Sequence, residues 1–238
     1  MRLQFIACKV MQREAYFCAA RSKNVVDVVL MEQGLHDEPQ KLRSEVLKAL
    51  DNTCDIQGRP YDASLLGYGL CSNGVAGLSA KIPIVVPRGH DCITLLLGSK
   101  DRYQEYFDSH RGVYWYSAGW IESGKQPSRE RYEQLLRQYT EKYGEDNARY
   151  LMEVEQGWIG QYNWATYIDW GLVNSDEYRD YTKRCAEFLN WNYDELKGNS
   201  DLMQKLVDGR WDDGEFLVVK PGQAIKEDLT SAGIMKAE

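Results

Sequence analysis

Five residues with sulfur or imidazole side chains are the strongest candidates for chemistry in this sequence: Cys8, His36, Cys71, His90 and Cys92. Thiolate sulfur and imidazole nitrogen are ligands that zinc and iron favour in proteins, and a thiolate is also a strong nucleophile. The chain has six cysteines in 238 residues, which is too sparse for a disulfide scaffold, and no Cys-x-x-Cys pair. These spacings exclude zinc fingers and ribbons and favour a centre assembled from distant segments.

The elements expected around these residues are strands that alternate with helices. Short apolar runs predict strands over residues 3–8, 25–31, 63–66 and 82–86. A helical segment is expected between the first two strands, and a second helix begins near Pro39, which suits a first helical turn. This alternation predicts an α/β protein with a mostly parallel sheet and helices on both faces.

All five candidate residues lie in loops that follow predicted strands. Cys8 ends the first strand, His36 follows the second, Cys71 follows the third, and His90 and Cys92 follow the fourth. Right-handed crossovers put such loops along one edge of a parallel sheet, and open α/β sheets bind ligands outside that edge. We therefore expect the side chains to share one site.

The spacing of His90 and Cys92 lets both side chains address the same atom, because alternate residues of an extended chain project to the same side. Asp91 resembles the N-cap of a short helix that begins at Cys92, so we expect the helix dipole to acidify this thiol. Cys71 is expected in a similar place, just before a helix over residues 74–80.

A glycine-rich loop, residues 67–74, follows the third strand. Ser72 stands where a dinucleotide-binding fingerprint requires glycine, so the loop does not match that motif. Gly67 and Gly69 still permit close backbone approach and a nest of amide groups around an anion, and Arg88 suits a carboxylate or a phosphate. We expect these three residues to contact a cofactor or ligand.

The second half of the chain is rich in aromatic residues, and all seven tryptophans lie beyond residue 100. One helix is expected from an N-cap at Ser128 to a stop at Gly144, another begins near Ser175, and a late strand covers residues 216–220. We interpret the chain as one domain, 1–238, in which a sheet core (1–122) carries the Cys/His cluster. The remainder, 123–238, is expected to form a helical layer that includes the late strand.

Composition excludes two classes of function. The formal net charge is −7 and no basic stripe follows the chain, which argues against nucleic-acid binding. No apolar run approaches the roughly 18–20 residues that cross a bilayer, and the start lacks the pattern of a signal peptide. We expect a cytoplasmic protein without a membrane partner.

Four stretches of this sequence are similar to one family: Ile6-Ala7-Cys8, Leu66-Gly67-Tyr68-Gly69-Leu70-Cys71-Ser72-Asn73-Gly74, Pro87-Arg88-Gly89-His90-Asp91-Cys92-Ile93-Thr94-Leu95-Leu96-Leu97-Gly98, and Tyr114 to Trp120. They resemble domain-of-unknown-function family 1638 over most of residues 3–122. Members occur in anaerobic bacteria and methanogens, often beside corrinoid-dependent methyltransferase systems. The resemblance implies a methyl-transfer context, in which zinc typically activates a thiolate, but it carries no catalytic assignment.

The leading hypothesis is a metal-binding protein, an enzyme or accessory factor of one-carbon or corrinoid-linked methyl-transfer metabolism. Cys8, Cys71 and Cys92 would be thiolate ligands to zinc or iron, and His90 or His36 would be a fourth ligand or a proton carrier. A small-molecule substrate is expected, with a corrinoid protein or a methyltransferase as partner and corrinoid as partner cofactor.

Three alternatives stay open at this point. The three cysteines could hold a [4Fe–4S] cluster with one open iron. Cys92 could instead be a covalent nucleophile, with His36 a better placed base than the nearby His90. The cysteines could also be inert core residues of a metal-free small-molecule binding module.

Overall fold

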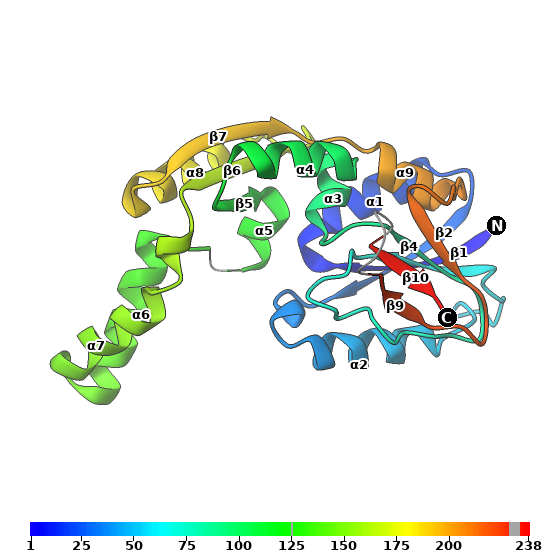
Figure 1. Ribbon diagram of the computed structural model, residues 1–238, viewed down its shortest axis with the longest axis horizontal. Coiled ribbons are helices and arrows are strands. Elements are labelled where there is room, and N and C mark those ends of the chain that lie inside the picture. Colours follow the sequence, from blue (N-terminus) through cyan, green and yellow to red (C-terminus); the bar gives the residue numbers. More distant parts are fainter. Residues whose placement is uncertain (125, 229–233) are drawn as a thin grey trace. The chain divides into compact units, whose positions relative to one another are not determined.

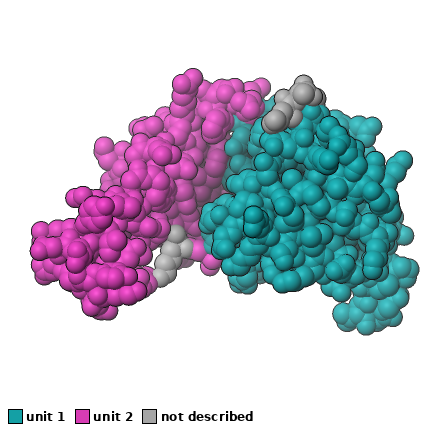
Figure 2. All heavy atoms as spheres, turned by 60° about the horizontal axis from the view of Figure 1, so that its bottom comes forward, with its two compact units in different colours: residues 1–103, 198–238 teal, residues 104–197 magenta. Residues whose placement is uncertain are grey.

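A computed structural model describes residues 1–124, 126–228 and 234–238 of the chain. These residues group into two compact units (Figure 2). The first unit contains residues 1–103 and 198–238, and the second contains residues 104–197. The first unit carries all the candidate residues of the Cys/His cluster, and the two units are described separately below.

The first unit is built on a five-stranded sheet with the order β2-β1-β3-β4-β8. Its strands are β1 (Arg2–Cys8), β2 (Val25–Met31), β3 (Ala63–Gly67), β4 (Ile84–Pro87) and β8 (Phe216–Val219). Strands β1 to β4 are parallel, and β8 pairs with β4 in the antiparallel direction. The predicted α/β class and the mostly parallel sheet are confirmed.

Helices cover both faces of this sheet (Figure 1). The helical segments of the first unit are η1 (Lys9–Met11), α1 (Gln12–Arg21), η2 (Leu35–Asp37), α2 (Pro39–Leu50), α3 (Ile93–Leu97) and α9 (Asp201–Asp208). Helix α9 contacts α1, α3 and strands β3 and β4, whereas α2 lies across the other face. Helix α4 (Lys100–Ser109) follows α3 along the chain.

The strand order contains a topological switch point. From β1 the chain crosses through α1 to β2 on one side, whereas from β3 it proceeds to β4 on the opposite side. Right-handed crossovers that run in opposite directions put their helices on opposite faces, as observed for α1 and α2. In open α/β sheets, ligands bind outside the carboxyl ends of the strands near such a point, which lies here between β1 and β3.

The centre of the sheet is apolar, with one buried polar link. Every residue of β3 and β4 is buried, which suits strands covered on both faces. The paired residues Gln4 and Ser64 are both buried; the Ser64 hydroxyl donates to Gln4 Oε1 (2.9 Å), and Gln4 Nε2 donates to the Ala49 carbonyl (3.0 Å). The link satisfies both side chains and joins β3 and β1 to the end of α2.

A C-terminal hairpin, β9 (Ile225–Glu227) and β10 (Met235–Ala237), completes the first unit. The Gly77 N–H donates to the Ile225 carbonyl (2.7 Å), and the Ile225 N–H donates to the Leu78 carbonyl (3.0 Å). Residues 71–77 form turns, so the expected helix over residues 74–80 is wrong. The hairpin instead supplies backbone partners to this part of the chain.

The second unit has its own parallel sheet, in the order β5-β6-β7. Its strands are β5 (Val113–Ser117), β6 (Trp164–Asp169) and β7 (Asn192–Lys197). The sequence interpretation assigned residues 123–238 to a helical layer with one late strand and therefore missed β6 and β7. The late strand itself, β8, is found as expected.

The helical segments of the second unit are α5 (Ala118–Ser123), α6 (Arg129–Tyr143), α7 (Glu145–Gln156), η3 (Ile159–Gln161) and α8 (Asp176–Leu189). The Ser128 hydroxyl accepts from the Arg131 N–H (3.2 Å) and Gly144 ends α6, as predicted. Helix α8 packs on β6 and β7 over a core that includes Tyr116 and Tyr167. Among the described residues, no helix has the length and apolarity needed to cross a membrane.

Candidate functional site

Three cysteines stand at the ends of three neighbouring strands of the first unit. Cys8 is the last residue of β1, Cys71 lies in the loop after β3, and Cys92 precedes α3 in the loop after β4. Cys8 and Cys71 are 8% and 6% exposed, whereas Cys92 keeps a larger exposed surface. All six cysteines of the chain fall within the described residues, and all six are free thiols.

Backbone contacts bring the Cys71 and Cys92 loops together. The Leu70 N–H donates to the Gly89 carbonyl (2.8 Å), and the Cys71 N–H donates to the His90 carbonyl (2.9 Å). A Cβ atom on Gly69 would lie 2.6 Å from both the Asp91 nitrogen and the Gly89 oxygen. Glycine is therefore required at position 69 because the two loops touch there through their main chains.

The three thiols interact electrostatically. Burial raises the pKa of Cys71 first, and the charges of Asp91 and Cys8 raise it further. Burial likewise raises the pKa of Cys92 well above its ordinary value, followed by the charges of Cys71, Asp91 and Cys8. The pKa of Cys8 is also raised, chiefly by burial. The sequence predicted an acidified Cys92 thiol, and this prediction is wrong because removal from water and negative neighbours outweigh the start of a five-residue helix.

Tyr68 lies among these thiols. Residues Ala7 and Gly67 are paired across β1 and β3, so the next residues along the two strands, Cys8 and Tyr68, are neighbours. Burial raises the pKa of Tyr68 first, and the charges of Cys8, Cys71 and Cys92 each raise it further. Tyr68 is 3% exposed, and its hydroxyl has no hydrogen-bond partner in the described part of the chain.

The backbone around Cys71 is strained. Cys71, Ser72 and Asn73 have φ angles of 46°, 55° and 63°, so three successive non-glycine residues adopt the left-handed conformation. This conformation costs about 1–2 kcal/mol for each such residue. Strain of this kind persists only where the surrounding structure holds it, and it concentrates at functional sites.

Contacts from two other segments hold this left-handed turn. Arg43 Nη2 in α2 donates to the Asn73 carbonyl (2.9 Å), and Asn73 Nδ2 donates to Glu227 Oε2 in β9 (3.2 Å). A Cβ atom on Gly74 would lie 2.4 Å from Cδ2 of Leu42, so the turn also packs tightly on α2. The position of Cys71 is thus fixed by a helix and by the C-terminal hairpin together.

Asp91 orders the loop that carries Cys92. Its Oδ1 accepts from the Ile93 N–H (2.9 Å), and its Oδ2 accepts from the Tyr103 hydroxyl (3.0 Å). Burial raises the pKa of Asp91, whereas these two hydrogen bonds and the charge of His90 lower it. The prediction that Asp91 is the N-cap is wrong by one residue: α3 begins at Ile93 and its N-cap is Cys92, while Asp91, one position earlier, still accepts from the Ile93 N–H.

The two histidines of the predicted cluster are more exposed than the thiols. His90 is exposed, and its backbone carbonyl holds the Cys71 N–H. His36 lies in η2 and is partly exposed, with its Nε2 atom 3.4 Å from Asp37 Oδ1. His90 therefore lies in one of the loops that carry the thiols. His36 pairs with Asp37 in its own loop.

Gly67, Gly69 and Arg88 were predicted to contact a cofactor. In the structure, each of them contacts other segments of this chain. Arg88 Nε donates to the carbonyls of Asp213 (2.8 Å) and Phe216 (3.2 Å), and its Nη1 donates to the carbonyl of Met235. A Cβ atom on Gly67 would lie 2.8 Å from the Ala7 Cβ, and Gly69 contacts the 89–91 backbone. Arg88 joins the Cys92 loop to β8 and β10, and the glycines let strands and loops approach closely.

Metal-ligand geometry is not preformed. Within residues 1–124, 126–228 and 234–238, no group of three or more His, Cys, Asp and Glu side chains is arranged so that it could hold a metal ion. Sequence reasoning also missed Tyr68. Its place opposite Cys8, two residues beyond the third predicted strand, was the available signal.

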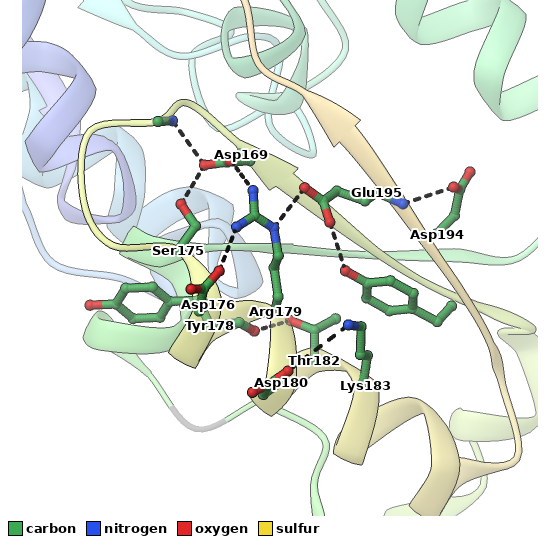
Figure 3. Close-up of polar contacts among 12 residues, drawn as sticks. Asp169, Ser175, Asp176, Tyr178, Arg179, Asp180, Thr182, Lys183, Asp194 and Glu195 are labelled. Atoms are coloured by element: carbon green, nitrogen blue, oxygen red, sulfur yellow. Dashed lines mark hydrogen bonds and ion pairs between the residues drawn. The ribbon is translucent and has the colours of Figure 1, made fainter.

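The second unit also carries a polar cluster near its strand ends (Figure 3). Arg179 in α8 forms ion pairs with Asp169 of β6, with Asp176 (3.1 Å) and with Glu195 of β7 (2.8 Å). Asp169 Oδ1 also accepts hydrogen bonds from the Ser175 hydroxyl (2.6 Å) and the Gly171 N–H (2.8 Å). These pairings tie α8 to the sheet and explain the cluster as a structural network.

A family model for proteins of unknown function (DUF1638) matches residues 30–207. The match covers most of the chain, so the protein belongs to this family. Comparisons with curated proteins and with solved structures gave no significant match.

Proposed function

We propose that this protein binds a thiophilic metal centre, a zinc ion or an iron–sulfur cluster, through Cys8, Cys71 and Cys92. One observation carries the proposal: main-chain hydrogen bonds join the Cys71 and Cys92 loops beside the end of β1, where Cys8 lies, at a topological switch point. Independent core cysteines have no reason to collect at the edge where α/β sheets bind ligands.

The raised thiol pKa values favour this proposal over a cysteine nucleophile. A nucleophilic cysteine needs a lowered pKa or an adjacent base, and burial raises the pKa of Cys92 instead. A bound cation reverses this situation, because its charge deprotonates the thiols that coordinate it. Binding also requires the thiol side chains to turn between staggered rotamers, since the described conformation does not hold a metal ion.

Three protein ligands leave one coordination position open for a substrate. Cys8, Cys71 and Cys92 would hold the zinc ion, which would supply Lewis-acid activation of a thiol or water, and His90 in the adjacent exposed loop would exchange protons with solvent. We extend the proposal to one-carbon metabolism, with a corrinoid protein as partner, because zinc-bound thiolates are suitable acceptors of methyl groups. Six free thiols are typical of a reducing compartment, so the proposed location is the cytoplasm.

The proposal is tested by anaerobic purification of the full chain, elemental analysis and visible absorption spectroscopy. We expect either zinc in a colourless protein or iron with acid-labile sulfide in a coloured one. Cys71→Ser should lose the metal. Cys185→Ser is the matched control, because Cys185 is also a buried free thiol but lies in the core of the second unit.

Two results would contradict the proposal. Metal-free wild-type protein that also fails to bind added zinc or to accept a reconstituted cluster removes the metal centre. Equal metal content in Cys71→Ser and wild type removes Cys71 from the ligands. Circular dichroism of both variants separates loss of ligand from loss of fold.

A further inference from the structure

Strand β2 is an edge strand of the five-stranded sheet, and its outer side has no partner strand among the described residues. The opposite edge strand, β8, contacts β10. Six of the seven residues of β1 are buried, whereas none of the seven residues of β2 is buried, and Val25 is 49% exposed. An edge strand of this length offers a row of N–H and C=O groups to another strand.

The main-chain direction of β2 identifies the groups that point to this open side. The Val25 N–H donates to the Met1 carbonyl (3.0 Å), so the main-chain groups of Val25 point toward β1. Successive residues of a strand direct these groups to opposite sides. Val26, Val28 and Leu30 therefore direct their N–H and C=O groups away from β1, and no main-chain hydrogen bond to these groups is found in the described part of the chain.

Features that block edge pairing are scarce in β2. Natural edge strands are often protected by proline, lysine or a bulge. Strand β2 pairs with β1 without a break, contains neither proline nor lysine, and has six apolar residues out of seven. Its one charged residue, Asp27, interacts with the Tyr61 hydroxyl, and its Oδ2 atom is buried. This charge therefore lies within the first unit and leaves the open side of β2 apolar.

The pattern of β2 fits a second copy of the same strand. Two copies of a strand related by a twofold axis perpendicular to the sheet run antiparallel, and each contact occurs twice. With the axis at Val28, all seven residues overlap: Val28 faces the partner subunit's Val28, and Val26 faces the partner subunit's Leu30. These residues direct their main-chain groups outward, so each facing pair exchanges two hydrogen bonds. Asp27 faces the partner subunit's Val29, whereas an axis at Asp27 would put two carboxylates directly opposite each other.

The charges that flank β2 favour the same arrangement. Lys23 precedes the strand and Glu32 follows it, and both residues are exposed. Antiparallel pairing brings the lysine end of one copy beside the glutamate end of the other, so the charges at both ends of the junction are complementary. This complementarity identifies a second copy of the chain as the partner.

We propose that the chain forms a dimer by antiparallel pairing of β2 with β2 of a second copy, about a twofold axis at Val28. The two five-stranded sheets then form one continuous sheet, and the valine side chains of β2 pair across the junction. The proposal does not depend on the metal centre, because β2 contains none of the proposed ligands.

The first test measures the mass of the full-length protein by sedimentation equilibrium under reducing conditions. Wild type should be a dimer, and Val28→Lys should be a monomer, because two like charges would meet at the axis. Lysine is tolerated on edge strands, and circular dichroism checks that the variant is folded. Val154→Lys is the matched control: Val154 is 62% exposed in α7 of the second unit, so this variant should remain a dimer.

The second test measures the register by disulfide crosslinking. The background is Cys54→Ser, because Cys54 is an exposed native thiol. Val28→Cys places the two introduced thiols opposite each other with Cα atoms about 5.5 Å apart, which a disulfide can span. Oxidised glutathione should convert this variant to a covalent dimer by thiol–disulfide exchange, seen on non-reducing electrophoresis. In the matched control, Val26→Cys, the introduced thiols are four residues apart, about 13 Å, and should link at least about 10-fold less.

Wild type that is monomeric at every concentration measured overturns the proposal. A dimer that is lost in Val154→Lys but kept in folded Val28→Lys also overturns it, because the interface then lies on the second unit. Equal linkage of Val28→Cys and Val26→Cys contradicts pairing at Val28. If Val28→Lys does not fold, the crosslinking comparison decides by itself, since selective linkage of Val28→Cys supports the paired strands and its absence removes them.

Discussion

The larger sheets of the two units both carry polar groups near the carboxyl ends of their parallel strands, but the hydrogen bonds of these groups are satisfied in one unit and not in the other. In the second unit, Arg179 meets three carboxylates, and Asp169 receives further hydrogen bonds from its own loop. In the first unit, the buried Tyr68 hydroxyl has no hydrogen-bond partner among the described residues, and burial raises the pKa of the nearby thiols Cys8, Cys71 and Cys92. The left-handed turn at Cys71 adds backbone strain to this edge.

This difference distinguishes a structural network from a binding site. Polar groups that complete one another within the folded chain need nothing more, and they hold the elements together. Polar groups that remain unpaired in a strained and tightly packed setting destabilise the folded chain until a ligand provides their partners. The edge of the first unit is thus the better candidate for ligand binding, although the edge of the second unit has more charged residues.

The largest effect on stability is expected from Gly69→Ala. This substitution changes the point at which the Cys71 and Cys92 loops of the first unit touch. The added methyl group would lie 2.6 Å from backbone atoms of Gly89 and Asp91, and neither can move as a flexible side chain would. We expect a loss of about 3 kcal/mol in the free energy of unfolding, measured by urea denaturation, together with loss of metal binding.

Gly160→Ala is the control for this substitution. No atom lies within 4 Å of the Cβ position at Gly160, so its stability should change by less than about 1 kcal/mol. A Gly69→Ala protein as stable as wild type would show that the two loops separate readily, and the close packing of the thiol loops would then lose its importance.

A smaller effect on stability is expected from Arg179→Met, which removes the ion pairs that join α8 to the sheet of the second unit. It leaves Asp169, Asp176 and Glu195 without their shared cation, while methionine keeps much of the side-chain packing. The arginine side chain is 27% exposed, so solvent screens part of the loss, and we expect about 1–2 kcal/mol of destabilisation.

Arg149→Met removes an exposed cation paired with Glu145 at 3.9 Å, and it should cost less than about 0.5 kcal/mol. Neither arginine variant should change zinc binding. A metal affinity that falls in Arg179→Met would mean that the network of the second unit does more than hold its own elements together.

Apart from the controls, the smallest effect on stability is expected from Ser72→Gly, which relieves backbone strain in the turn at Cys71. Ser72 has φ 55°, a conformation that glycine adopts without a steric penalty, so the free energy of unfolding should rise by about 0.5–1 kcal/mol. Ser44→Gly is the matched control in helix α2, where the same change should lower stability by a similar amount. Equal destabilisation in both variants would contradict strain at Cys71.

Local sequence patterns predicted most of the first unit. The strand predicted over residues 25–31 matches β2 residue for residue, and the Pro39 helix begins where its proline suggested. The position of each cysteine relative to its strand followed directly, because an apolar run marks where a buried strand ends. Ser128 and Gly144 likewise marked both ends of α6.

The sheet of the second unit was missed because its strands do not form plain apolar runs. Strand β5 carries tyrosine and tryptophan at successive positions, and β7 is largely polar. Their aromatic and β-branched residues in fact favour strands, but helical spacing of aromatic residues in the same region drew the interpretation toward helices.

The sequence by itself determined that the chain folds as α/β and that three cysteines follow three buried strands, since these features depend on residues near one another in the chain. Tertiary structure alone decided that the hydroxyl of buried Tyr68 would find no hydrogen-bond partner among the described residues. It also decided that Cys71 would sit in a left-handed turn held by Arg43 and Glu227. Hydrogen-bond satisfaction, burial and backbone strain depend on contacts between distant segments, and no local pattern encodes them.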